Sequence, residues 1–187
     1  FGGDAANITI VENAGNEKVY YEFHQDGSQR NCLVIPDGAF RNPMTVEQIQ
    51  NQIVRMPLTG VVMDGSTVFN FAQKEVPILV DSLTKMAETT KEDIDWFLFH
   101  QPNKFMLQKL AERIGVPFEK MPMDIVEKFG NSNSATIPTA ITADLKEEML
   151  NKESLCCLAG FGAGVAWAGI IMKMGKLDFC DTIISNL

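Results

Sequence analysis

The sequence has 187 residues, of which 45% are hydrophobic and 21% are charged. This composition allows a sizeable core, and the length fits one domain or one half of a pseudo-symmetric fold. The net charge of -8 makes nucleic acid a poor partner, and no apolar run approaches the roughly 20 residues that a membrane-spanning helix needs.

The N-terminal third predicts two strands and an irregular excursion. Residues 7–12 alternate like a strand within a sheet, and residues 19–25 form a second strand candidate after a turn at Gly15. Residues 36–57 are polar and rich in Pro and Asn, with a weak helical pattern over 46–54. We interpret this excursion as a surface segment or lid.

The rest of the chain predicts alternating helices and strands. Helical periodicity after Asp64 indicates a long helix that Pro77 should kink. An apolar strand, an amphipathic helix, a helix with a buried first half and two closing strands follow, with expected bounds 96–99, 104–114, 135–150, 155–159 and 165–174. This alternation predicts an α/β layered domain.

The four cysteines show no metal-ligand spacing. They are Cys32, Cys156, Cys157 and Cys180, without a Cys-x-x-Cys pair or a Cys/His pattern, so no metal site is predicted. Cys156 and Cys157 lie in the middle of a strand between leucines, which is a poor environment for a nucleophile. Reduced thiols, and an opening at Phe1 without a basic segment, predict a cytoplasmic protein with no signal peptide.

His100 is the first candidate for chemistry. It stands where the apolar strand 96–99 ends, with Gln101 and Asn103 as further donors. A lone histidine at such a place is more often a satisfied core residue, yet sites of open α/β folds collect at the carboxyl ends of strands. A neutral imidazole donates one hydrogen bond and accepts another, which suits a polarised carbonyl or a proton transfer.

Asn131 is the second candidate, and the pattern leaves two interpretations open. The run Gly-Asn-Ser-Asn-Ser at 130–134 is rich in residues that cap helices and form turns. Alternatively, the Asn131 amide is directed at an oxyanion beside a helix N-terminus. The glycine turn 160–164 lacks the third glycine of a nucleotide-binding loop and precedes a strand, so we expect it to offer a backbone N–H to a substrate oxygen.

Three ordered motifs in the second half of the chain are specific when taken together. They are His100-Gln101-Pro102-Asn103, then Gly130-Asn131-Ser132-Asn133-Ser134-Ala135-Thr136-Ile137-Pro138, then Phe161-Gly162-Ala163-Gly164-Val165-Ala166-Trp167. This set closely resembles β-ketoacyl-acyl-carrier-protein synthase III, in which His-Gln-Ala-Asn, Gly-Asn-(Thr/Ser)-Ser-Ala-like and Phe-Gly-Gly-Gly-x-x-Trp motifs occur in the same order. Residues 1–6 and 63–69 also resemble segments of that family.

The resemblance implies the C-terminal half of a thiolase-like fold, an α/β arrangement with a layered mixed sheet and a buried central helix. Residues 1–35 would be the last strands of the N-terminal half, and residues 36–62 a surface excursion or lid. Residues 63–187 would be the C-terminal half with a short extension. The family's nucleophilic cysteine would then lie upstream of Phe1.

The resemblance also implies an acyltransferase of fatty acid biosynthesis. Its members accept an acyl group from coenzyme A and condense it with malonyl-carrier protein after decarboxylation, without a cofactor. His100 and Asn131 would stabilise the enolate, the Ala163 N–H would serve an oxyanion hole, and Phe161 would pack beside the reacting carboxylate. The residues that would lie near the pantetheine arm are Asn103, Gly65 and Phe69.

The implied partners are acyl-carrier protein, acyl-coenzyme A, the N-terminal half of the enzyme and, when complete, a second copy in a homodimer. The family's basic docking residue falls on Phe105, which leaves Lys104, Lys109 and Arg113 as the weaker docking candidates. We expect the chain alone not to catalyse condensation, because its nucleophile would be absent.

Three other hypotheses stay open. The first is a thiolase-fold acyltransferase of secondary metabolism that uses the same His/Asn pair on other acyl groups. The second is a non-catalytic partner subunit, although such a subunit needs neither His100 nor Asn131. The third is a cysteine hydrolase that pairs Cys157 with His100.

Overall fold

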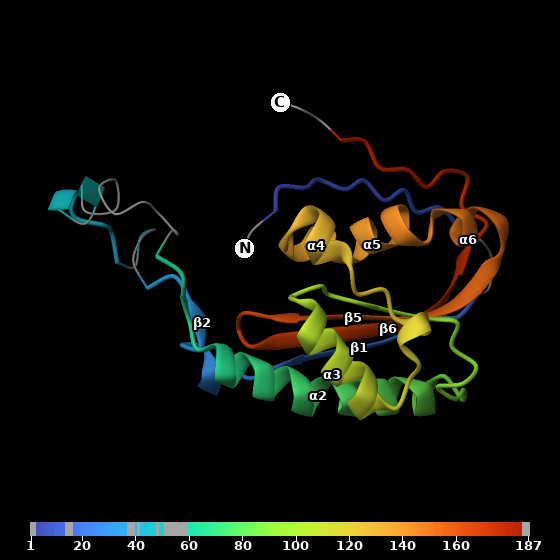
Figure 1. The fold of residues 1–187 in the computed structure, drawn as a ribbon. Coiled ribbons are helices and arrows are strands. Elements are labelled where there is room, and N and C mark those ends of the chain that lie inside the picture. Colours follow the sequence, from blue (N-terminus) through green and yellow to red (C-terminus); the bar gives the residue numbers. More distant parts are fainter. Residues whose placement is uncertain are drawn as a thin grey trace.

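The computed structural model describes residues 3–13, 17–36, 40, 42–47, 49–50 and 60–184. In this part of the chain a four-stranded mixed sheet lies between two helical layers (Figure 1). The strand order is β1-β6-β5-β4, in which β4 runs parallel to β5 and the other two pairs are antiparallel.

The elements follow one another in this order. They are β1 (Tyr20–Gln25), η1 (Gly27–Gln29), β2 (Leu33–Val34), β3 (Val62–Met63), α2 (Gly65–Met86), β4 (Trp96–Phe99), α3 (Lys104–Ile114), η2 (Phe118–Lys120), α4 (Ile125–Phe129), η3 (Asn133–Ala135), α5 (Thr136–Asp144), α6 (Lys146–Asn151), β5 (Glu153–Gly162) and β6 (Ala166–Gly175). The short strands β2 and β3 pair with each other, apart from the main sheet.

The sheet has one hydrophobic core on each face. Successive residues of a strand point to opposite faces, so Phe97 and Phe99 of β4 join the core under α2 and α3. Leu98, between them, joins the core on the α5 and α6 side with Met149 and Cys156. Burial on both faces explains why β4 is apolar along its whole length rather than alternating.

Helix α2 packs closely against β6, and glycine permits this approach. A Cβ atom at Gly169 would lie 2.7 Å from Cδ1 of Leu83 and 3.0 Å from Cδ2 of Leu79. Both leucines are buried on the apolar stripe of the helix. This packing holds α2, with α3 beside it, against one face of the sheet.

Most of the predicted elements are confirmed, and three differ. Residues 7–12 are extended and exposed but form no strand. The helix expected over 135–150 is divided into η3, α5 and α6, because the backbone leaves the helical region at Leu145, whose φ is -120°. Strands β5 and β6 are longer than predicted, so the turn between them is confined to 163–165.

The buried first half of this divided helix is confirmed. Ala135, Thr136, Thr139 and Ala140 are all buried, against the side of the sheet that faces α5. Helix α2 continues through Pro77. Of the weak pattern at 46–54, residues 46–47 and 49–50 are helical and the others lie outside the described residues, as does the turn expected at Gly15.

Asp64 caps the N-terminus of α2 and gives the helix a pH-dependent stability. Hydrogen bonds from the Thr67 and Ser66 hydroxyls and from the Thr67 N–H lower the pKa of this carboxyl to about 2. The unfolded value is about 3.9. A lowered folded-state pKa means that the stabilisation is complete above the unfolded value and is lost as the pH falls through the folded value.

We therefore expect Asp64→Ala to lower the urea midpoint at pH 7, and the difference from wild type to vanish as the pH falls from about 4 to about 2. Urea unfolding followed by circular dichroism across this range measures it. Asn70→Ala, at an exposed position of the same helix, is the control. A difference for Asp64→Ala that stays constant down to pH 2 would contradict the expectation.

None of the helices in the described ranges is both long and apolar enough to cross a membrane. Within the same residues, no three His, Cys, Asp or Glu side chains are grouped so that they could hold a metal ion.

Candidate active site

His100 follows β4 directly and is positioned by the sheet. Its backbone N–H donates to the Ala159 carbonyl of β5 at 2.8 Å, which extends the parallel pairing by one residue. Its ring packs edge-on against Phe161, with the centroids 5.6 Å apart. Burial lowers the pKa of His100 below its usual 6.5, although the nearby Asn133 carbonyl partly offsets this, so the ring is neutral at pH 7.

Thr136 connects His100 to the turn that carries Asn131. The Oγ atom of Thr136 lies 2.8 Å from Nδ1 of His100 and donates a hydrogen bond to the Asn133 carbonyl at 2.8 Å. Only 1% of Thr136 is exposed. The sequence did not single out Thr136, and the available signal was a polar residue at the start of a helix whose first half is predicted to be buried.

Asn131 fulfils one of the two predicted roles and leaves its amide nitrogen free for the other. Its Oδ1 accepts the Asn133 N–H at 2.9 Å, which forms the expected turn. Asn133 adopts a φ of +53°, a left-handed conformation that Asn tolerates better than most residues. Since Oδ1 is occupied, Nδ2 of Asn131 is the open donor, and it has no partner among the residues that the structure describes.

Two hydrogen bonds connect the N-terminal segment to the turn that carries Asn131 and to the start of the helix after it. The Gly3 N–H donates to the Asn131 carbonyl at 3.0 Å, and Nδ2 of Asn7 donates to the Ala135 carbonyl at 3.2 Å. A Cβ atom at Gly3 would collide with the Phe129 carbonyl, so only glycine allows this approach. In Figure 1 the segment passes along the outer side of α4 and α5. Sequence pattern gave no sign of this contact.

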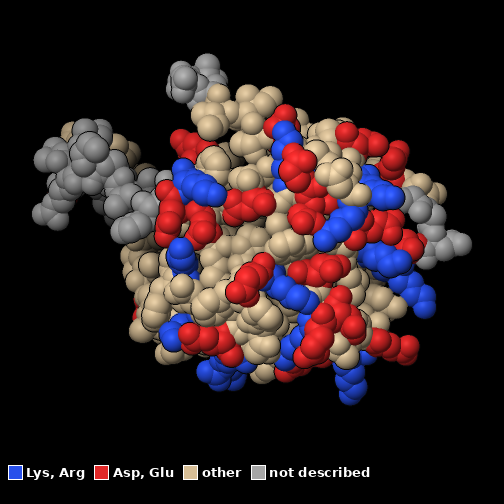
Figure 2. Space-filling view, turned by 45° about the vertical axis from the view of Figure 1, so that its right-hand side comes forward, with Lys and Arg blue, Asp and Glu red and all other residues tan. Residues whose placement is uncertain are grey.

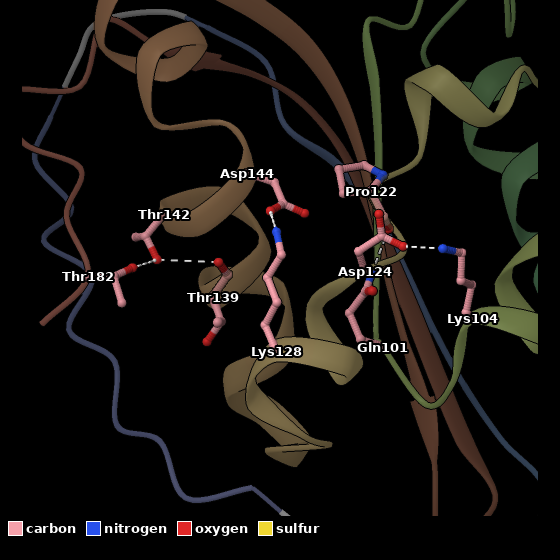
Figure 3. Close-up of polar contacts among 9 residues, drawn as sticks. All are labelled: Gln101, Lys104, Pro122, Asp124, Lys128, Thr139, Thr142, Asp144 and Thr182. Carbon is pink, nitrogen blue, oxygen red and sulfur yellow. Dashed lines mark hydrogen bonds and ion pairs between the residues drawn. The ribbon is translucent and has the colours of Figure 1, made fainter. Parts of the chain in front are cut away.

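Gln101 does not add a donor to the site, contrary to expectation. Its side chain is fully buried, and its Nε2 donates to the Pro122 carbonyl at 2.9 Å (Figure 3). The same Nε2 also donates to the Phe99 carbonyl at 3.0 Å. A buried amide needs such partners because desolvation without them is costly. Gln101 therefore fixes the chain after β4 instead of facing a ligand.

Asn103 and Phe69 lie near the start of α3. Oδ1 of Asn103 caps α3 by accepting the Met106 N–H at 2.8 Å, while the side chain stays exposed. Phe69 of α2 stacks on the exposed Phe105 of α3, with the ring centroids 5.8 Å apart. Gly65 is the first residue of α2, on the same face of the sheet. The sequence did not predict the Phe69–Phe105 pair.

Ala163 is exposed in the turn between β5 and β6, two residues after the Phe161 ring that contacts His100. Gly164 has a φ of +140°, and a Cβ there would lie 2.9 Å from the Ala166 nitrogen, so this position requires glycine. The turn is short because β5 and β6 pair up to Gly162 and Ala166.

The three predicted docking residues differ in their pairing. Nζ of Lys104 lies 2.6 Å from Asp124 (Figure 3) and 3.7 Å from Glu127. Nζ of Lys109 lies 2.7 Å from Glu112. Arg113 is exposed and has no ion pair within the described ranges. Figure 2 shows basic side chains interspersed with acidic ones over this face of the molecule. The basic stripe expected along α3 is thus largely neutralised.

The cysteines offer no activated thiol in the described part of the chain. Cys156 and Cys157 are fully buried, and burial raises the pKa of each thiol to about 12. Cys32 and Cys180 are also buried, and burial raises the pKa of Cys180. A protonated, inaccessible thiol is a poor nucleophile, which argues against the cysteine hydrolase hypothesis.

A shallow hollow of about 370 Å³ lies beside the site rather than at it. Its lining includes Lys104, Asp124 and Asp144, together with Trp96, but neither His100 nor Asn131.

Comparison with known proteins points to one family. Residues 84–174 match the 3-oxoacyl-[acyl-carrier-protein] synthase III C-terminal domain. The synthase III of Synechocystis sp. is 31% identical over 173 residues, covering 92% of this chain and 51% of the relative. The chain resembles the C-terminal half of β-ketoacyl-acyl-carrier-protein synthase III.

Solved structures agree with this assignment. The 3-oxoacyl-acyl-carrier-protein synthase of Burkholderia xenovorans aligns with a TM-score of 0.81 and 32% identity, over 92% of this chain and 49% of that one. The priming β-ketosynthase of the R1128 polyketide pathway aligns with a TM-score of 0.63 and 25% identity, over 85% and 45%. The thiolase-like fold is confirmed, and the chain spans about half the length of the synthase III relatives it matches.

Proposed function

We propose that this chain is the C-terminal part of a condensing enzyme of the synthase III type. The complete enzyme would join an acyl thioester to malonyl-carrier protein with loss of CO₂. The observation that supports this most is the hydrogen-bonded unit His100–Thr136–Asn133–Asn131, which links the imidazole at the end of a parallel strand to the turn that carries Asn131. The family similarity makes that unit the expected site.

Decarboxylative condensation requires hydrogen-bond donors at the oxygen where negative charge develops. When the bond between the malonyl methylene carbon and its carboxylate breaks, CO₂ leaves and the electron pair forms a thioester enolate. The enolate carbon then attacks the acyl thioester and expels the thiolate. Nδ2 of Asn131 and the His100 ring would bind the enolate oxygen, and preorganised donors of this kind are among the largest contributions to catalysis.

The nucleophile would come from an N-terminal half that this chain does not include. Strand β1 (Tyr20–Gln25) already pairs with β6 in the sheet of this chain. Of residues 1–35, the extended segment 3–13 would therefore be the part that completes the sheet of the other half. Residues 36–62 would be a surface excursion, and residues 63–187 would form the C-terminal half. The exposed Ala163 turn would add its backbone N–H to an oxyanion hole, and Phe161 would shield the reacting carboxylate.

The thioester substrates would reach His100 along the N-terminal ends of α2 and α3. Asn103, Gly65 and Phe69 would lie along a pantetheine arm, donated by coenzyme A or by acyl-carrier protein. Because Lys104 and Lys109 are already ion-paired, Arg113 would be the main basic contact for an acidic carrier protein. The complete enzyme would be a cytoplasmic homodimer that needs no cofactor.

Intact mass spectrometry after incubation with a short acyl-coenzyme A tests the proposal. We expect no acyl adduct on this chain, because its cysteines are buried, and an adduct on the N-terminal half once that half is supplied. The completed enzyme should then release CO₂ from malonyl-carrier protein. A stoichiometric adduct on Cys156 or Cys157 would contradict the proposal and favour a self-contained cysteine enzyme.

Two alternatives share the same site. The alignment with a priming β-ketosynthase of a polyketide pathway keeps an acyltransferase of secondary metabolism as the second candidate. Profiling the completed enzyme with short, branched and aromatic acyl-coenzyme A substrates separates it from the fatty acid enzyme. A non-catalytic partner subunit would release no CO₂ in any of these assays.

A further inference from the structure

The buried hydroxyl of Thr136 contacts three polar groups at once. Its Oγ atom lies 2.8 Å from Nδ1 of His100, 2.8 Å from the Asn133 carbonyl oxygen and 3.3 Å from the Gln101 backbone nitrogen. A hydroxyl has one proton to donate and two lone pairs that accept. The group that receives its proton therefore decides which nitrogen of His100 carries a proton.

The Asn133 carbonyl is the group that receives it. A carbonyl oxygen can only accept, so its short approach to Oγ is favourable only with the hydroxyl proton between the two oxygens. The Gln101 N–H can only donate, and it uses one lone pair of Oγ. The second lone pair is left for His100, which fills it by donating from Nδ1–H.

We propose that Thr136 is a positioning residue that sets the tautomer of His100. It holds the ring proton on Nδ1 and leaves Nε2 as the nitrogen open to accept a proton. The Thr136 hydroxyl is the side-chain partner of Nδ1, and the edge contact with Phe161 fixes the plane of the ring. A hydrogen bond to one ring nitrogen is the usual means by which a protein selects the state of the other.

This tautomer suits proton uptake from a thiol, a consequence that rests on the proposed function. When the thiol of the N-terminal half transfers its proton to Nε2, the S–H bond breaks and an N–H bond forms, which gives a thiolate and an imidazolium. Thr136 keeps the same hydrogen bond throughout, because Nδ1 is protonated before and after the transfer. The new Nε2–H is then the donor that a thioester carbonyl or enolate oxygen requires, while the coenzyme A thiolate leaves as the anion and takes its proton from water.

Long-range ¹H–¹⁵N correlation spectra of the imidazole rings test this assignment on the chain as it stands. The sequence has only two histidines, and His100→Gln identifies the signals of each. At pH 8 we expect Nδ1 of wild-type His100 at the shift of a protonated nitrogen and Nε2 at that of an unprotonated one. Thr136→Val, which keeps the side-chain shape, should move both shifts toward the averaged values of a ring in tautomer exchange.

Two further variants show whether a change in the His100 shifts comes from loss of the Thr136 hydroxyl or from a general disturbance of the structure. Thr136→Ser retains the hydroxyl and should restore the wild-type shifts. Thr139→Val removes another buried hydroxyl of α5, whose single hydrogen bond in the described part of the chain goes to the Ala135 carbonyl, and should leave His100 unchanged.

A wild-type ring with the proton on Nε2, or with averaged shifts, would overturn the proposal. So would unchanged shifts in Thr136→Val, or a failure of Thr136→Ser to restore them. These spectra involve no substrate, so the tautomer assignment can fail while the condensing activity stands, and the activity can fail while the tautomer holds.

Discussion

In the enzyme completed by an N-terminal half, Asn131→Ala is expected to slow decarboxylative condensation about 10²–10³-fold, the cost of removing one preorganised oxyanion donor. The reason is geometric. Oδ1 of Asn131 is held by the Asn133 N–H, so Nδ2 is presented as a fixed donor. The measurement is the rate of CO₂ release from malonyl-carrier protein at saturating acyl-coenzyme A.

His100→Ala should reduce the same rate by a similar factor, and the double variant should lose less than the product of the two, because both donors serve one developing charge. Asn151→Ala is the matched control, since it makes the same chemical change on α6, where in the described residues the amide bonds to Glu147 alone. If Asn131→Ala raised KM while leaving kcat unchanged, Asn131 would bind the ground state and the transition state equally, and the oxyanion role would be wrong.

The largest effect on stability is expected from Phe97→Ala, at about 3–5 kcal/mol. Phe97 is completely buried between the sheet and its α2 and α3 layer, and its ring meets Phe99 edge-on with the centroids 6.1 Å apart. Removal of the ring leaves a cavity that the paired strands β4 and β5 cannot close by local collapse. Urea unfolding at neutral pH, compared at equal m-values, measures the loss.

Phe23→Ala is the control for this prediction, because 67% of Phe23 is exposed on the edge strand β1. Its effect should stay within about 0.5 kcal/mol, as at other surface positions. Equal losses for the two variants would mean that the sheet is not the cooperative core described above.

The elements that carry the site were predictable because their patterns are local. The bounds of β4 and α3 coincide with the apolar run at 96–99 and the amphipathic stretch at 104–114. The extended segment 7–12 was mispredicted because alternation alone cannot reveal whether a neighbouring strand exists to pair with it. The break at Leu145 was missed because helical composition continues through 150 and the backbone changes direction only to pack α6 on the sheet.

Sequence by itself determined the layered α/β class, the placement of His100 after a buried strand and the turn that carries Asn131, because each depends on residues close together along the chain. Tertiary structure alone decided which polar groups serve the site. The Gln101 amide is buried and bonded to the Pro122 carbonyl, and Lys104 forms an ion pair with Asp124. Tertiary structure also placed the Thr136 hydroxyl against His100, 36 residues away. A hydrogen bond across that separation depends on how α5 packs beside β4, and no local pattern records that packing.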